Sequence, residues 1–151
     1  MAYTVGKSQK LYSNWDIDKL YFVDDKKPFN SVVSSESTFI VYFWASWCPH
    51  CENIYPIMNS LSSLNVPFVA MTFDTEMEKY KDYVSTKKPL WSDIMFLSSE
   101  GDIEFVSRKE AYAIPSIPSV WIIKNGKVQK IFKGEKGIAK LPAYLKKASL
   151  L

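Results

Sequence analysis

The chain has 151 residues, of which 47% are hydrophobic and 15% aromatic, and its net charge is +3. This is enough apolar material for one globular domain with a sizeable core, and it excludes a disordered chain. No apolar run approaches the roughly 20 residues that a membrane-spanning helix needs, so we predict no membrane span. The first ten residues lack the apolar centre of a signal peptide. We expect an extracytoplasmic location, such as the bacterial periplasm, if a signal segment has been removed, and a cytoplasmic one if the chain is complete.

The first predicted elements are short. Residues 19–23 read as a strand and residues 24–27 as a turn. Residues 29–34 read as a second short strand or a helical turn. This segment leads into the longest apolar run of the chain.

Residues 39–44 are all β-branched or aromatic, which predicts a buried strand, and both cysteines follow closely. The pattern predicts a strand, a tight turn and a helix, with Cys48 at or just before the first helical turn. Free backbone N–H groups there would stabilise a thiolate, so Cys48 is the candidate nucleophile, and we expect it to be exposed. Cys51 lies on the same side of that turn, within disulfide reach. Pro49 fits a first helical turn.

Apolar residues at helical spacing predict that this helix continues to Leu64, bent at Pro56. Residues 68–73 form the next predicted strand, parallel to the first because a helical crossover joins them.

A further helix is predicted to run to about Ser85. Asp74 or Thr75 can cap it, and Glu78 would complete a Thr-x-x-Glu capping box. Lys88 and Pro89 should end it.

Residues 89–113 include two more predicted elements, a short edge strand at residues 94–97 and a helix at residues 103–112. Trp91 could be a functional residue, but we favour an aromatic plug packed over the inserted helix. The sequence leaves open whether this segment faces a substrate or enlarges the core.

Residues 119–124 and 127–133 are two predicted strands, and Asn125-Gly126 between them is the signal for a type I′ hairpin. A C-terminal helix is predicted at residues 138–150, with Pro142 close enough to its start to be tolerated. Its apolar stripe would consist of Ile138, Leu141, Leu145 and Ala148.

The end of the chain is rich in lysine and has a single acid, Glu135. The lysines are Lys124, Lys127, Lys130, Lys133, Lys136, Lys140, Lys146 and Lys147. A nucleic-acid surface is one interpretation. We favour a solvated strand and helix face, because the charge is lysine without arginine or interleaved exposed aromatic residues, and we predict no nucleic-acid partner.

Two segments resemble a known family. Residues 43–51, Phe-Trp-Ala-Ser-Trp-Cys-Pro-His-Cys, resemble the active-site segment of the thioredoxin superfamily, and the Cys-Pro-His-Cys version resembles that of DsbA-type oxidoreductases. Residues 112–126 resemble the cis-proline strand and following hairpin of thioredoxins. The resemblance extends from residue 39 to about residue 134. Around residues 44–48 the sequence resembles TlpA-like redoxins more closely than DsbA.

The resemblance implies an α/β thioredoxin fold, with a central mixed sheet flanked by helices. An N-terminal extension and an insertion before the cis-proline strand would be added to it. We expect one domain over residues 1–151, with its core at about residues 38–150, and a monomer.

The resemblance also implies a thiol-disulfide oxidoreductase. Cys48 would attack a protein disulfide, a mixed disulfide would form, and Cys51 would resolve it. The partners would be protein thiols and disulfides and a redox partner that the sequence does not identify, with no cofactor. Whether the protein acts as a reductase, an oxidase or an isomerase is open.

Four residues near the pair would tune it in this interpretation: Trp47, Pro49, His50 and Tyr42. Protonated His50 would stabilise the Cys48 thiolate and make the disulfide more oxidising, unless it is a surface residue without a role. Tyr42 stands where thioredoxin has a buried Asp, six residues before the nucleophile, and a phenol is a poor base at neutral pH. Glu52 is a speculative substitute.

The second matching segment places Ile117 and Pro118 beside the disulfide. A cis bond between them would leave the Ile117 backbone free to pair with an extended substrate, and a trans proline at a strand start is the alternative.

Other function classes fit less well. Structural zinc needs four ligands, and Cys48, Cys51 and His50 supply at most three, so we predict no metal site. A peroxiredoxin would resemble Pro-x-x-x-Thr-x-x-Cys before its nucleophile, whereas Val41 and Ala45 occupy those positions. A non-catalytic thioredoxin-fold interaction module is the main alternative, although it would not need an intact Cys-x-x-Cys.

Overall fold

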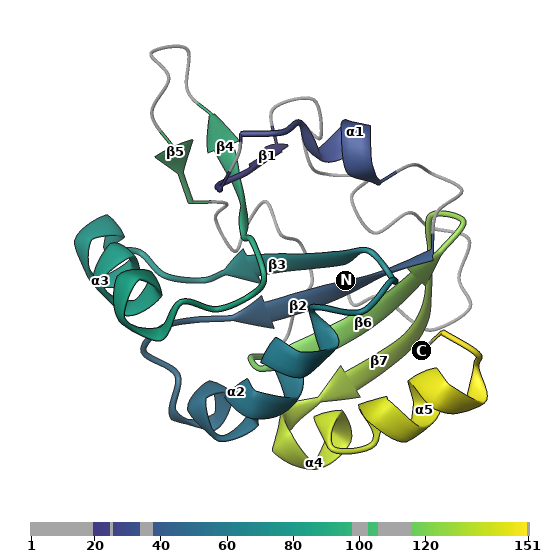
Figure 1. Ribbon diagram of the computed structural model, residues 1–151. Helices are drawn as coiled ribbons and strands as arrows, with labels where there is room; N and C mark the ends of the chain where they lie inside the picture. Colours follow the sequence, from purple (N-terminus) through teal and green to yellow (C-terminus); the bar gives the residue numbers. More distant parts are fainter. Residues whose placement is uncertain (1–19, 25, 34–37, 98–102, 106–115, 151) are drawn as a thin grey trace.

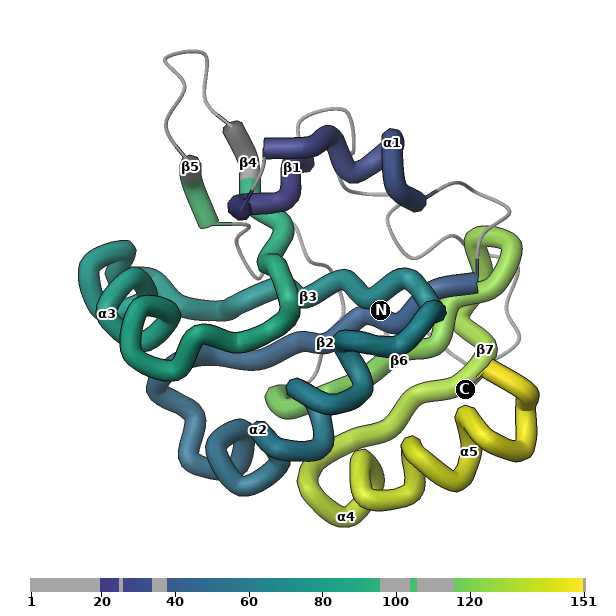
Figure 2. The backbone as a smooth tube through the Cα atoms, viewed as in Figure 1, coloured from purple at the N-terminus to yellow at the C-terminus, as the bar shows by residue number. Residues whose placement is uncertain are grey.

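The structure is a computed structural model, and it describes residues 20–24, 26–33, 38–97, 103–105 and 116–150 (Figure 1). The strands are β1 (Leu20–Phe22), β2 (Thr38–Trp44), β3 (Phe68–Thr72), β4 (Ile94–Leu97), β5 (Ile103–Glu104), β6 (Ser119–Lys124) and β7 (Lys127–Lys133). The helices are α1 (Phe29–Val32), α2 (Pro49–Leu61), α3 (Met77–Lys87), α4 (Gly134–Ile138) and α5 (Leu141–Lys147). Figure 2 follows the chain through them.

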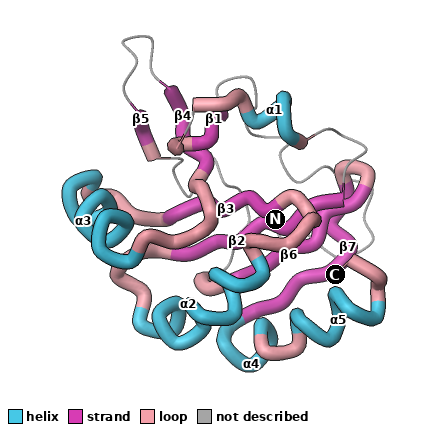
Figure 3. The backbone as a smooth tube through the Cα atoms, in the orientation of Figure 1, coloured by secondary structure: helices cyan, strands magenta, loops and turns pink. Residues whose placement is uncertain are grey.

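A mixed sheet of four strands forms the centre of the molecule, in the order β3-β2-β6-β7 (Figure 3). Strand β2 is parallel to β3 and antiparallel to β6, and β7 pairs antiparallel with β6. Every residue of β2 after Thr38 is buried. The apolar run of β2 thus occupies the inside of the sheet, and the predicted parallel β2–β3 pair is confirmed.

The predicted hairpin between β6 and β7 is also confirmed. Asn125 and Gly126 have φ values of 53° and 75°. A type I′ turn requires positive φ at both central positions, which these residue types tolerate.

Helix α2 connects β2 to β3 and lies across the sheet, with α4 and α5 beside it along β7 (Figure 1). It ends at Leu61, one turn before the predicted Leu64, where the N–H of Ser62 donates to the carbonyl of Met58. Pro56 lies inside the helix, as predicted.

The single C-terminal helix that we predicted is wrong. The chain forms two short helices, α4 and α5, separated by a turn at residues 139–140. Pro142 explains the break, because it has no N–H to continue a helix from Ile138 but is tolerated in the first turn of α5. Leu141 and Leu145 are buried as predicted, whereas Ala148 is exposed.

A second, smaller sheet has the order β1-β4-β5 and lies beyond the β3 edge of the central sheet. The first predicted strand, at β1, is confirmed, and α1 is the helical turn among our two alternatives. Strand β4 pairs with both β1 and β5, so it is not the edge strand we predicted. The helix predicted at residues 103–112 is wrong at its start, where β5 forms; residues 106–112 lie outside the described residues.

Trp91 is buried, as a packed aromatic residue should be, and most of the inserted helix predicted beneath it lies outside the described residues. Its ring centroid lies 5.4 Å from Tyr42, 5.3 Å from Trp44 and 5.4 Å from Tyr55. It therefore joins the sheet to α2, within the aromatic part of the core.

Among the described residues, no helix has both the length and the apolar character needed to cross a bilayer. In the same part of the chain, no three His, Cys, Asp or Glu side chains are grouped so that they could bind a metal ion.

Candidate active site

The two cysteines lie where β2 turns into α2. Cys48 is the N-cap of α2, with φ −87° and ψ 111°, and Pro49 occupies its first turn. The N–H of Cys51 donates to Sγ of Cys48 at 3.2 Å. The cysteines form a disulfide with their Cα atoms 5.2 Å apart. The strand, turn and helix predicted for this segment are confirmed.

The environment of Cys48 favours a negatively charged sulfur in the reduced protein. Its Sγ lies at the positive end of the α2 dipole and already accepts one backbone hydrogen bond. Cys48 is 3% exposed and Cys51 is 4% exposed. The exposed nucleophile that we predicted is wrong, because both cysteines are buried in the disulfide form. Trp47, the residue before Cys48, is 61% exposed.

Asp74 holds the turn that carries the cysteines. Its carboxylate accepts the N–H of Ser46 at 3.0 Å and also accepts the hydroxyl groups of Ser46 and Thr72. The predicted capping role of Asp74 or Thr75 is wrong, since α3 begins at Met77 with Glu76 as its N-cap and no side-chain cap bond. The only sequence signal for the role of Asp74 was its place directly after a buried strand.

His50 contacts a carboxylate across the site. Its Nδ1 lies 2.5 Å from Oε2 of Glu135 in α4, and Nδ2 of Asn53 donates to the same oxygen at 3.2 Å. Hydrogen bonds from His50 and Asn53 hold the pKa of Glu135 below its ordinary value. The only signal for Glu135 in the sequence is its position as the single acid among many lysines.

The bond between Ile117 and Pro118 is cis, as predicted. The carbonyl of Pro118 accepts the N–H of Gly134 at 2.9 Å, which joins the start of β6 to the start of α4. A groove of about 510 Å³ lies here, lined by His50, Ile117, Pro118, Lys133, Gly134, Glu135 and Lys136. The groove brings three predicted site residues together: His50, Ile117 and Pro118.

Tyr42 is buried in an aromatic cluster on the face of β2 that also carries Trp44. Its ring lies 5.4 Å from Trp91 and 6.3 Å from Phe68. Burial, with smaller contributions from the charges of Asp93 and Glu52, raises the pKa of Tyr42 above its ordinary value. Its hydroxyl therefore stays protonated at physiological pH and cannot act as a base.

Glu52 is held by helix α3. The Tyr83 hydroxyl donates to its Oε1 at 2.5 Å, and Nζ of Lys87 lies 2.9 Å from its Oε2. Burial raises the pKa of Glu52, but the hydrogen bonds from Tyr83 and Lys87 and the Lys87 charge outweigh it and leave the pKa below its ordinary value. Glu52 is thus a weaker base than an unpaired glutamate, which argues against it as a substitute for the missing Asp.

Comparisons with known proteins give a consistent result. The family model described as Thioredoxin matches residues 20–89. Thiol-disulfide oxidoreductase ResA from Bacillus thuringiensis subsp. konkukian is 30% identical over 113 residues, covering 70% of this chain and 60% of ResA. Protein disulfide-isomerase from Datisca glomerata is 24% identical over 155 residues, covering 99% of this chain and 26% of the plant protein. The chain therefore spans less than two thirds of either relative.

Solved structures match over most of the chain. A thio-disulfide isomerase from Thermus thermophilus has a TM-score of 0.59 and 23% identity, covering 85% of this chain and 89% of the other. A thiol-disulfide isomerase from Corynebacterium glutamicum has a TM-score of 0.64 and 16% identity, covering 87% and 92%. At these identities, the matches describe a shared fold.

Proposed function

We propose that this chain, which has the predicted thioredoxin fold and whose residues 20–89 match the Thioredoxin family model, is a protein thiol-disulfide oxidoreductase. The observation that carries the proposal is the Cys48–Cys51 pair at the start of α2, with a backbone N–H directed at the first sulfur. Two thiols at this spacing are sufficient for a two-electron exchange.

The reaction proceeds through a mixed disulfide. In the reduced protein, the Cys48 thiolate attacks one sulfur of a substrate disulfide, and the other substrate sulfur leaves as a thiolate. The deprotonated Cys51 then attacks Sγ of Cys48 and releases the second substrate thiolate. The protein ends with the Cys48–Cys51 disulfide and the substrate is reduced by two electrons. The same steps in reverse oxidise a substrate dithiol.

The substrate is a protein segment that lies in extended form beside Pro118. The backbone of Ile117, which lines the groove next to His50, pairs with this segment as an added strand. The exposed indole of Trp47 offers an apolar contact for a partner next to Cys48. Protein thiols and disulfides are therefore the partners, together with a redox partner that regenerates the pair, and the protein works as a monomer.

The neighbouring residues adjust the pair in different ways. Pro49 fixes the first turn of α2, and His50 supports the Cys48 thiolate. Tyr42 stands where thioredoxin has a buried Asp, but it does not act as a base. Another group must therefore accept the proton of Cys51.

Insulin reduction driven by dithiothreitol tests the proposal. We expect the wild-type protein to exceed the rate of dithiothreitol alone, and Cys48→Ser to return it to that rate. Cys51→Ser is the matched variant, because it keeps the nucleophile but cannot resolve. It should accumulate a mixed disulfide with a substrate protein, visible as a dithiothreitol-sensitive adduct in mass spectrometry, whereas Cys48→Ser should not.

Turnover by Cys48→Ser at the wild-type rate would refute this mechanism. A wild-type protein that neither reduces insulin nor exchanges with glutathione would instead indicate the non-catalytic interaction module.

A further inference from the structure

Glu135 is an acidic residue beside the first turn of α2 that the proposed mechanism does not use. It comes from α4, 85 residues away in the chain, and its Oε2 lies 2.5 Å from Nδ1 of His50. Asn53, one turn further along α2, donates to the same oxygen at 3.2 Å. One carboxylate oxygen therefore binds two side chains of α2, which fixes where the imidazole lies.

The position of Glu135 is set by the backbone around it. Gly134 has φ +66°, a conformation that side chains rarely adopt, and no atom would lie within 4 Å of an added Cβ. The glycine is therefore required for the turn out of β7 and not for space. Its N–H donates to the carbonyl of Pro118. The residue after this turn is thus directed to the groove, where Glu135 meets His50.

We propose that Glu135 is a positioning residue, which acts through His50 to favour the thiolate of Cys48. This inference rests on the proposed function. The carboxylate requires the proton on Nδ1 and fixes the ring in the first turn of α2, which Cys48 caps. A protonated imidazole held there would favour the thiolate. Stabilising the thiolate stabilises the reduced pair.

The charges in the groove support the same direction. Lys133 and Lys136 line it together with His50, and both also favour an anion. Among the described residues that line the groove, Glu135 is the only acid, and it contacts His50. A carboxylate without this partner would only oppose the thiolate, whereas Glu135 also holds the imidazole in place.

The redox equilibrium with glutathione measures this effect. At pH 7 we expect Glu135→Gln to shift the equilibrium towards the disulfide form by about twofold to fivefold, the range for one solvent-exposed ion pair. Glu135→Asp should move it less, because it keeps the charge. Glu104→Gln is the matched control, since it removes one carboxylate from an exposed position on β5 and should leave the equilibrium unchanged.

A double-mutant cycle with His50→Ala decides whether Glu135 acts through the imidazole. In the His50→Ala background, Glu135→Gln should have no effect or a small opposite one. The effect of Glu135→Gln in the wild-type background should also shrink as ionic strength rises, because the pair is exposed.

An equal shift with and without His50 would overturn the inference, as would an unchanged equilibrium in Glu135→Gln. Thermal melts of all variants show whether a shift comes from loss of folding. The proposed function fails separately, if the wild-type protein does not exchange with glutathione at all.

Discussion

The carboxyl group of Asp93 is buried among aromatic side chains. It accepts hydrogen bonds from Nε1 of Trp44 and from the Tyr80 hydroxyl, both at 2.6 Å. Burial raises the pKa of Asp93 to about 7, more than these two hydrogen bonds lower it. Trp44 ends the strand that leads to Cys48, so its hydrogen bond to Asp93 connects the core to the active-site turn.

Asp93 should make the stability of the protein depend on pH. Its pKa is about 7 in the folded chain and 3.8 in its unperturbed state, so between these values the folded protein holds one more proton than the unfolded chain. The free energy of unfolding should therefore fall as pH rises from about 4 to about 7, by up to about 4 kcal/mol. Urea unfolding at pH 4.5, 6 and 7.5 measures this decrease.

Asp93→Asn is the variant for this prediction, because its carbonyl and amide can still bind Trp44 and Tyr80 but cannot titrate. Its stability should change less over the same pH range. Asp82→Asn removes an exposed carboxylate from α3 and should follow the wild type. Equal pH dependence in the wild type and Asp93→Asn would show that Asp93 does not titrate in this range.

At the scale of elements, the turn between β2 and α2 is held by the loop between β3 and α3. Asp74, 4% exposed, accepts hydrogen bonds from Ser46 and Thr72. The N–H of Cys48 donates to the carbonyl of Ala45 at 3.2 Å, which closes the same turn. The cysteines are thus positioned by contacts between two loops that are distant in the chain.

Asp74→Ala should destabilise the protein by about 2 to 4 kcal/mol, because the buried Thr72 hydroxyl and the half-buried donors of Ser46 lose their acceptor. Asp74→Asn keeps one carbonyl acceptor and should cost less. In the reduced protein, alkylation of Cys48 by iodoacetamide should also change in rate in Asp74→Ala, since the turn is no longer fixed. Wild-type stability and alkylation rate in Asp74→Ala would show that the turn holds its shape without this carboxylate.

The correct predictions depend on residues close together in the sequence. The apolar run of β2, the position of Cys48 at the helix start and the Asn125-Gly126 turn are all local signals. The break before α5 was also a local signal, at Pro142, which we interpreted wrongly. Other incorrect predictions depend on distant contacts. Asp74 had a suitable side chain for capping α3, but Ser46, 28 residues away, uses its carboxylate. Glu135 could not be assigned a role because its partner is 85 residues away.

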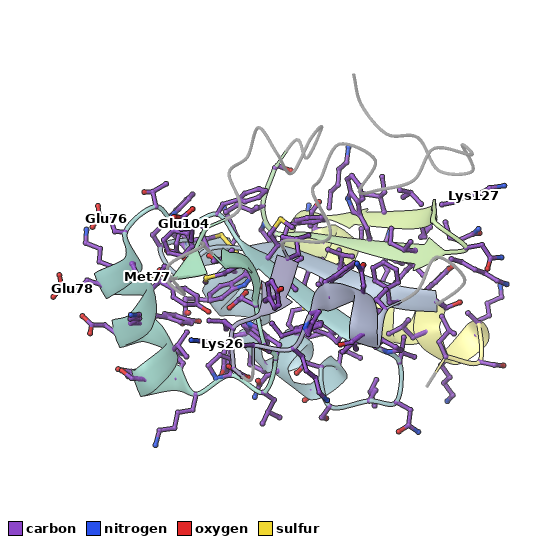
Figure 4. The ribbon with its side chains drawn as sticks, turned by 90° about the horizontal axis from the view of Figure 1, so that it is seen from above. Lys26, Glu76, Met77, Glu78, Glu104 and Lys127 are labelled. Carbon is purple, nitrogen blue, oxygen red and sulfur yellow. A yellow bond between two sulfur atoms is a disulfide. The ribbon has the colours of Figure 1, made fainter. Side chains whose placement is uncertain are left out.

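At the scale of the whole molecule, charge is distributed unevenly. Figure 4 shows Glu76, Glu78 and Glu104 at one end and Lys127 at the other. Seven of the eight C-terminal lysines are exposed and Lys127 is half-buried, as a solvated face requires. Two of them, Lys133 and Lys136, line the groove that His50 and Pro118 also line. These two lysines make the potential in the groove more positive, which favours an anion there.

The interactions around the Cys48 sulfur also make the stability of the folded protein depend on the redox state of the cysteine pair. The folded protein offers the Cys48 sulfur a backbone N–H and the positive end of α2, whereas the unfolded chain offers neither. The disulfide itself adds little to the free energy of unfolding, because a loop closed over three residues removes little entropy from the unfolded chain. Interactions that favour the reduced form in the folded state must then make the reduced protein the more stable one.

We expect the reduced protein to melt about 2 to 6 °C above the disulfide form at pH 7, which corresponds to roughly 1 to 2 kcal/mol for a chain of this size. Calorimetry with and without dithiothreitol measures the difference, and each form should unfold in one transition if residues 38–150 are a single domain. A Cys48→Ser, Cys51→Ser double variant should show no dependence on dithiothreitol. If the disulfide form melts higher, the folded structure favours the oxidised pair, and the protein is poised to reduce its substrates instead of oxidising them.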